Sequence, residues 1–77
     1  MNTLERISDI IRDVTQNPDS EITENSAAVD IDGWDSLSHI YIIAEIEDAF
    51  EVRMTAQEAA GAKNVGDLVS IVDSKLS

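Results

Sequence analysis

Apolar residues recur at helical spacing in three segments of this chain, and no segment alternates apolar and polar residues as a strand does. The first segment covers residues 4–14, the second runs from residue 35 or 36 to residue 50 or 51, and the third covers residues 64–76. In each segment the apolar side chains share one face of a helix. The sequence therefore predicts an all-α fold with three main helices.

Capping and turn residues mark the ends of the predicted helices. Asn2 is placed to cap the first helix, and Pro18 follows its end in a run of turn-forming residues. Thr55 and Glu58 form the Thr-x-x-Glu pattern of a capping box, which predicts a short third helix that ends near Gly61. We therefore expect a bundle of four helices, of which the third is short.

The segment between the first two helices is polar and irregular. It forms a loop of about 18 residues, which is longer than the connections of compact domains usually are. Three apolar residues are expected to anchor it: Ile22, Val29 and Ile31. Loops of this length are commonly functional or firmly held in place, and we expect the same here.

The charge of the chain is strongly negative and unevenly distributed. Its 77 residues include 16 Asp and Glu against 5 Lys and Arg, which gives a net charge of −11. Between Asp13 and Val52 there are eleven acidic residues and no Lys or Arg, so the whole excess lies in the long loop and the second helix. Such a field repels nucleic acids and anionic membrane surfaces and favours basic protein surfaces as partners.

Small size and the absence of cysteine limit the chemistry further. A domain of 77 residues buries only about 60% of its unfolded surface, so an enzyme with an enclosed active site is disfavoured. Without Cys the chain has no disulfide, thiolate metal site or thiol nucleophile. The longest apolar run, residues 40–44, is too short to span a membrane, and no basic and apolar leader opens the chain. We expect a soluble, cytoplasmic, monomeric protein.

The predicted second helix carries apolar residues on two faces. One face is a conventional core stripe: Ile42, Ile43, Ile46 and Phe50. The other, which we call the second apolar strip, lies nearly opposite: Leu37, Ile40, Tyr41 and Ala44. Two interpretations are open, because the helix is either buried all round at the centre of the bundle or exposes this strip for a partner to cover.

The tripeptide Asp35-Ser36-Leu37 stands at the start of this helix, directly after the long loop. Asp and Ser are preferred N-cap residues, so the simplest interpretation is a helix cap. The context adds to this interpretation. The serine follows a long loop in an acidic helical chain, and an apolar residue and the second apolar strip follow it.

Together these features resemble the acyl carrier protein family, whose signature is Asp-Ser-Leu at the head of the second of four helices. The resemblance covers almost the whole chain and includes the core stripe of the second helix, the acidic pair Glu47-Asp48 and Val65 at the start of the last helix. It implies a four-helix carrier fold and a single domain over residues 1–77. It also implies that a phosphopantetheinyl transferase, using coenzyme A and magnesium, esterifies Ser36 with 4′-phosphopantetheine. Acyl groups then travel as thioesters on the thiol of this arm, so the protein is implied to be a carrier and not an enzyme.

The resemblance assigns roles to the residues around Ser36. Asp35 is implied to cap the helix and to help the magnesium of the transferase, and the chain itself is expected to hold no metal. Leu37 is implied to be a docking residue beside the arm, and the rest of the second apolar strip extends it. Loading ligases or synthases and acyltransferases are expected to dock through basic patches on acidic residues of this helix: Asp35, Glu45, Glu47 and Asp48.

Three positions depart from the carrier of bulk fatty acid synthesis. Trp34 stands where that group usually has a small residue, Ser38 where it often has Asp, and Tyr41 where it has an acid. These changes replace charge by apolar surface beside the attachment site. They predict a specialised, free-standing carrier with a different set of partners.

Other motifs support weaker hypotheses. The run Asp30-Ile31-Asp32-Gly33 is similar to part of a calcium loop, but an EF-hand register would place Ala28 and His39 at ligand positions. His39 is the single histidine, and we expect it at the edge of the core face without a metal. The alternative function is an unmodified acidic interaction module that binds a partner through the strip around Leu37 and Tyr41.

Overall fold

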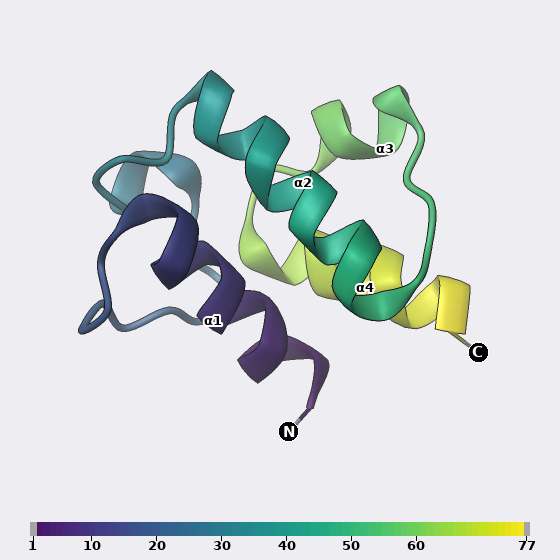
Figure 1. The fold of residues 1–77 in the computed structure, drawn as a ribbon, viewed down its shortest axis with the longest axis horizontal. Coiled ribbons are helices and arrows are strands. Elements are labelled where there is room, and N and C mark those ends of the chain that lie inside the picture. The colour runs from purple at the N-terminus through teal and green to yellow at the C-terminus, as the bar shows by residue number, and fades with distance from the viewer. Residues whose placement is uncertain (1, 77) are drawn as a thin grey trace.

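Four α-helices and one short 3-10 helix form the fold in the computed structural model, which describes residues 2–76. The elements are α1 (Thr3–Thr15), η1 (Ala28–Asp30), α2 (Ser36–Phe50), α3 (Ala56–Gly61) and α4 (Val65–Leu76) (Figure 1). The described residues contain no β-strand, only an isolated bridge between Ala27 and Asn64. The predicted all-α fold, with three main helices, a short third helix and a long loop, is confirmed.

Local hydrogen bonds set the ends of these helices where the sequence indicated them. The Asn2 side chain accepts the N–H of Glu5 at 2.8 Å and so caps α1. Thr55 and Glu58 form the predicted capping box, in which each side chain accepts the main-chain N–H of the other residue at 3.0 and 2.9 Å. Because these bonds join residues three apart, α3 begins at a position that the local sequence determines.

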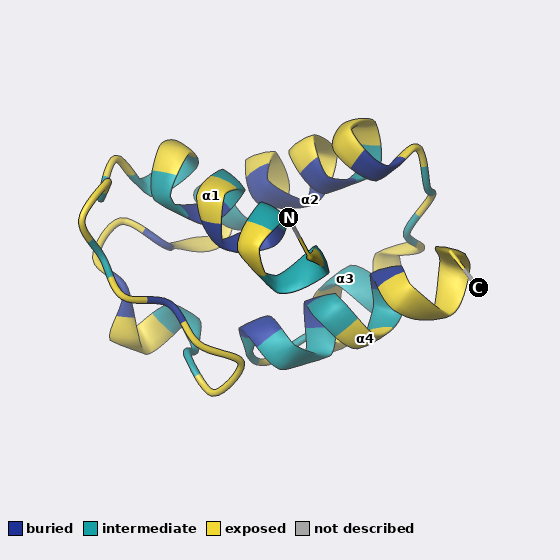
Figure 2. Cartoon of the chain, turned by 90° about the horizontal axis from the view of Figure 1, so that it is seen from below, coloured by how far each residue is buried: buried dark blue, intermediate teal, exposed yellow. Residues whose placement is uncertain are grey.

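The core lies where the apolar stripes of α1, α2 and α4 meet, and the buried stripes face the interior in Figure 2. Among residues 2–76, seven side chains are fully buried: Ile7, Ile11, Ile42, Ile46, Val65, Leu68 and Val72. The predicted core stripe of α2 is confirmed, since all four of its residues are buried. Leu76, predicted on the buried face of the last helix, is instead 52% exposed, because α4 ends there at the edge of the bundle.

The long loop is held by hydrogen bonds to α1 and α4. Arg12 of α1 donates through Nε to a main-chain carbonyl of the loop at 2.8 Å. The N–H groups of Val65 and Gly66, at the start of α4, donate to the carbonyls of Ser26 and Glu24 at 2.9 and 2.8 Å. The first N–H groups of a helix have no partner within it, so the loop caps α4 while α4 fixes the loop.

Two of the three predicted loop anchors are buried. Ile22 and Ile31 belong to the core, but Val29 is 94% exposed, so the prediction for Val29 is wrong. The reason is the unpredicted helix η1, where the Asp30 carboxylate accepts the N–H of Ala27 at 3.0 Å. This local turn directs Val29 outward.

Gly33 provides the turn that leads from the loop into α2. Its φ is +84°, a value that residues with a side chain rarely adopt, and a Cβ there would lie 3.1 Å from the carbonyl oxygen of Thr15. The turn places Trp34 in the core and leaves Ser36 at the surface as the first residue of α2.

Candidate functional site

Ser36 is exposed at the first position of α2, directly after the residue that caps this helix. The Asp35 carboxylate accepts the N–H of Ser38 at 2.8 Å, and this hydrogen bond lowers the pKa of Asp35 below its ordinary value. Asp35 is therefore the N-cap of α2, as its residue type predicted. The cap role belongs to Asp35, which leaves Ser36 as an exposed hydroxyl beside it.

A groove of about 410 Å³ opens beside Ser36. Its walls come from the loop, the start of α2 and the end of α3: Ala28, Trp34, Asp35, Ser36, His39, Ala60 and Ala62. The sequence placed Asp35 and Ser36 in this site, and the packing of the helices brings the end of α3 beside them. Three of the lining residues are alanines, whose small side chains leave the groove open.

The residues of this site fit a phosphate-linked arm. The Ser36 hydroxyl lies at the N-terminal end of α2, where the helix dipole and the first N–H groups stabilise negative charge. The groove offers an extended chain a surface along which to lie, and the Asp35 carboxylate borders it. Within residues 2–76, no three His, Cys, Asp or Glu side chains are grouped so as to bind a metal ion.

The second apolar strip of α2 is exposed. Leu37, Ile40 and Tyr41 are 61%, 64% and 56% exposed, and Ala44 is exposed with them. The interpretation that α2 is buried all round is therefore wrong. The strip begins next to Ser36 and follows α2 away from it, as a contiguous apolar surface on an otherwise acidic helix.

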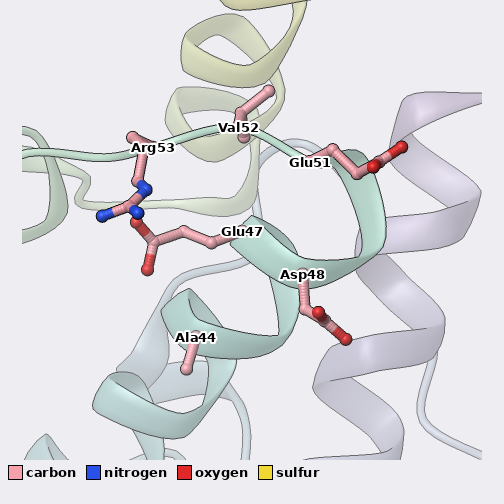
Figure 3. A pocket seen from close by; sticks show the side chains of 6 residues that line it. All are labelled: Ala44, Glu47, Asp48, Glu51, Val52 and Arg53. Carbon is pink, nitrogen blue, oxygen red and sulfur yellow. The ribbon is translucent and has the colours of Figure 1, made fainter.

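The acidic residues of α2 divide into two kinds. Glu45 and Asp48 are exposed, whereas Glu47 is partly buried and its Oε2 accepts the N–H of Met54 at 2.9 Å. A hollow of about 460 Å³ at this end of α2 is lined by Ala44, Glu47, Asp48, Glu51, Val52 and Arg53. Figure 3 shows the Glu47 carboxylate turned toward Arg53 and Asp48 pointing away from both. Glu47 thus holds the segment between α2 and α3, a role that the sequence did not suggest.

Trp34 is arranged differently from the expectation. It is only 8% exposed, so most of its ring adds to the core and only a small part borders the groove beside Ser36. Its Nε1–H donates to Nδ1 of His39 at 3.1 Å, and Nε2 of His39 lies 2.9 Å from the carbonyl oxygen of Ala59. His39 does lie at the edge of the core, as predicted, but its contact with α3 had no signal in the sequence.

No described helix combines the length and the apolar character that a membrane crossing requires.

Comparison with known proteins gives consistent similarities. The family described as "Phosphopantetheine attachment site" matches residues 5–72. An acyl carrier protein of Streptococcus pyogenes is 36% identical over 75 residues, which cover 97% of both chains. A meromycolate extension acyl carrier protein of Mycobacterium leprae is 38% identical over 66 residues, which cover 86% of this chain and 57% of the relative.

Solved structures agree with these sequence similarities. The solution structure of a holo acyl carrier protein from Geobacter metallireducens has a TM-score of 0.88 and 39% identity, covering 99% of this chain and 87% of that one. A putative acyl carrier protein from Mycobacterium tuberculosis has a TM-score of 0.85 and 33% identity, covering 94% of this chain and 96% of that one. These similarities favour a carrier over the unmodified interaction module.

Proposed function

The chain belongs to the acyl carrier protein family, and from this premise we propose that Ser36 is the residue that bears its 4′-phosphopantetheine arm. The protein is an acyl carrier and not an enzyme, and its cofactor is covalently bound. When attached, the arm supplies a terminal thiol that holds an acyl group as a thioester. The observation that carries the proposal is the position of Ser36, whose exposed hydroxyl opens α2 beside a groove and directly after a capping aspartate.

The hydroxyl of Ser36 is the group of this chain that changes covalently on attachment of the arm. A phosphodiester bond forms between Oγ of Ser36 and the phosphate of the pantetheine arm. The phosphoanhydride bond of coenzyme A breaks, adenosine 3′,5′-bisphosphate leaves, and the hydroxyl proton passes to a base of the transferase. The chain stabilises the product through the N-terminal end of α2, which favours the negative charge of the phosphodiester.

Two further features of the chain suit this role. Asp35 borders Ser36 with an ionised carboxylate, and we propose that it assists the magnesium of the transferase in addition to capping α2. The chain contains no Cys, so no thiol of its own competes for a thioester. We also propose that residues 1–77 form one carrier domain, which acts as a monomer in the cytoplasm.

Intact mass tests the attachment site directly. The protein is incubated with coenzyme A, magnesium and a phosphopantetheinyl transferase of broad specificity, and we expect the mass of one arm to be added. Ser36→Ala should add none. Ser38→Ala is the matched control on the same turn, because it removes a neighbouring hydroxyl but keeps the N–H that Asp35 accepts. An arm on Ser36→Ala, or none on the unaltered chain, would contradict the proposal.

We propose that the second apolar strip and the exposed acids of α2 form the docking surface for the biosynthetic enzymes that a carrier serves. The strip is apolar where it adjoins Ser36, and Glu45 and Asp48 follow it along α2. A complementary partner has an apolar pocket flanked by Lys and Arg. Glu47 contributes less than the sequence suggested, since its carboxylate is engaged by Met54. Tyr41 adds apolar area where other carriers have charge, which supports a specialised partner set.

Kinetics of arm attachment test this surface. Leu37→Ser should raise the KM of the transferase for the carrier by about five- to tenfold, as for one important interface side chain. Leu76→Ser is the control, because it changes a similarly exposed leucine at the end of α4. Asp48→Lys should reduce the dependence of the rate on salt, while Glu5→Lys makes the same change in net charge on α1. If Leu37→Ser and Leu76→Ser raised the KM equally, and Asp48→Lys and Glu5→Lys changed the salt dependence equally, the docking surface would lie elsewhere.

A further inference from the structure

Trp34 and His39 join the attachment loop to α3. Trp34 precedes the capping residue Asp35, and its indole ring stacks on the imidazole of His39 with centroids 6.0 Å apart and planes inclined by 20°. Trp Nε1 is a donor only, so Nδ1 of His39 must accept its hydrogen bond at 3.1 Å. The proton of the neutral ring then lies on Nε2, which donates to the carbonyl of Ala59 at 2.9 Å. Both nitrogens are therefore committed, and only one tautomer satisfies them.

The carbonyl that His39 reaches needs a partner. α3 ends at Gly61, so the carbonyl of Ala59 is one of the last four of the helix and has no intrahelical N–H to accept. A donor at this end of a helix also meets the negative end of its dipole. His39 thus acts as a C-terminal cap for α3, although it belongs to α2.

α3 depends on such contacts more than the other helices do. None of its residues is fully buried, and its apolar contact with the core comes from the partly buried Ala59. Apart from His39, the contacts that hold it include the ion pair between Glu58 and Lys75 at 3.0 Å and the bond from Met54 to Glu47 just before it. Of the hydrogen bonds and ion pairs described within residues 2–76, the one from His39 joins α3 to the residues next to Ser36.

The same two rings line the groove beside Ser36. Trp34 and His39 border it from the loop and from α2, and Ala60 and Ala62 border it from α3. The distance between these two sides is the width of the groove, and the hydrogen bond from His39 reaches Ala59, the residue next to Ala60 on the other side. A change in that bond must move α3 relative to Ser36 or leave the carbonyl of Ala59 without a partner.

We propose that the link Trp34–His39–Ala59 is a latch that holds α3 against the start of α2 and sets the width of the groove beside Ser36. His39 is then a positioning residue for cargo, because an acyl group that lies along the groove meets walls, His39 and Ala60, whose separation the latch sets. The claim about cargo rests on the proposed attachment at Ser36, whereas the latch itself does not.

Nuclear magnetic resonance of the unmodified protein tests the latch without any arm. The chain has one Trp and one His, so the indole N–H and the imidazole nitrogens give single, unambiguous signals. We expect the tautomer protonated at Nε2. Trp34→Phe, which keeps an aromatic ring but removes the donor, should release Nδ1 and shift its signal, while the Ala59 carbonyl keeps the proton on Nε2. A ring protonated at Nδ1 in the unaltered protein would overturn the latch.

Hydrogen exchange then measures what the latch holds. His39→Leu should speed exchange of the α3 amides relative to those of α1 by about five- to tenfold, as expected for the loss of one hydrogen bond. His39→Gln should restore much of the protection, because its side chain supplies both an acceptor and a donor. An unchanged exchange rate of the α3 amides in His39→Leu would overturn the latch. A loss of protection in His39→Gln as large as that in His39→Leu would overturn it as well.

The cargo claim is tested on protein loaded with acetyl, hexanoyl or dodecanoyl groups, with the spontaneous hydrolysis rate of the thioester as the readout. In the unaltered chain we expect hexanoyl and dodecanoyl to be more protected than acetyl, because they are long enough to lie along the groove. His39→Leu should lower the protection of these two longer groups, because the position of α3 is no longer fixed. The same dependence on chain length in both proteins would overturn the cargo claim. Failure to load at Ser36 would instead contradict the proposed function, and the resonance and exchange results on the latch would stand.

Discussion

The two ends of this bundle are held by different forces. Where α1, α2 and α4 meet, fully buried isoleucine, leucine and valine side chains form the core. At the end that carries Ser36, α3 has no buried residue: the partly buried Ala59 contacts the core, and hydrogen bonds and an ion pair add to this contact. A buried isoleucine contributes several kcal/mol and a single hydrogen bond about 1 kcal/mol net. The core therefore provides most of the free energy of unfolding. The end that meets cargo and enzymes can change its contacts at a small cost in free energy.

The largest effect is expected in the core, on the inner face of α2. Ile46 is fully buried, so Ile46→Ala should lower the free energy of unfolding by about 2–5 kcal/mol and Ile46→Val by about 0.5–1.5 kcal/mol. Ile40→Ala makes the same truncation on the exposed strip, where Ile40 is 64% exposed, and should change stability by less than about 0.5 kcal/mol. Urea unfolding, followed by the fluorescence of the buried Trp34, measures all three variants.

Equal losses of unfolding free energy for Ile46→Ala and Ile40→Ala would contradict the comparison, because the two faces of α2 would then contribute equally to stability. A small loss for Ile40→Ala together with impaired binding to enzymes would support it. The outer face would then be maintained for partners and not for folding.

An intermediate effect is expected at the turn before the attachment site. Gly33→Ala forces a side chain into a φ of +84° and toward the carbonyl of Thr15, and should cost about 1–3 kcal/mol. Gly61→Ala is the matched control at the end of α3. A Cβ there meets no atom within 4 Å, so the change should stabilise the protein by about 0.4–1 kcal/mol. Thermal unfolding distinguishes the two, and a Gly33→Ala protein as stable as the unaltered chain would mean that the turn is not strained.

The sequence predicted the core side of the molecule better than the attachment end, for a physical reason. The inner stripe of α2 and the capping box at Thr55 and Glu58 are local patterns, in which residues three or four apart share a helical turn. Trp34 lies in a segment without periodicity, so its burial depends on how the loop is folded. The partner of His39 is the carbonyl of Ala59, which only the packing of α3 brings near.

The candidate site shows the same division. Asp35, Ser36 and Leu37 could be placed at the head of a helix because cap residues and helical spacing are written in adjacent positions. The groove beside them could not, since one of its walls comes from α3. Glu47 illustrates the limit for charged residues. Its charge was visible in the sequence, but its bond to the N–H of Met54 depends on the path of the connection after α2.

The smallest effect is expected from the ion pair that holds α3 to α4. The N–H of Thr55, and secondly Lys75, lower the pKa of Glu58 below its ordinary value. A carboxyl whose pKa is lower in the folded than in the unfolded state stabilises the fold above the unfolded pKa, and this contribution is lost as the pH falls through the folded pKa. Protection of the α3 amides from hydrogen exchange should therefore be complete at neutral pH. It should decline below the usual glutamate value of about 4.3, while protection at Leu68 in the core persists further into acid.

Glu58→Gln keeps the capping geometry without the charge, so its α3 protection should be slightly reduced at neutral pH and should not change with acid over the same range. Glu45→Gln, on the exposed side of α2, should behave as the unaltered chain. If α3 and the core lost protection at the same pH in all three proteins, α3 would unfold only together with the core. The contrast between an apolar core and an end held by polar contacts would then fail.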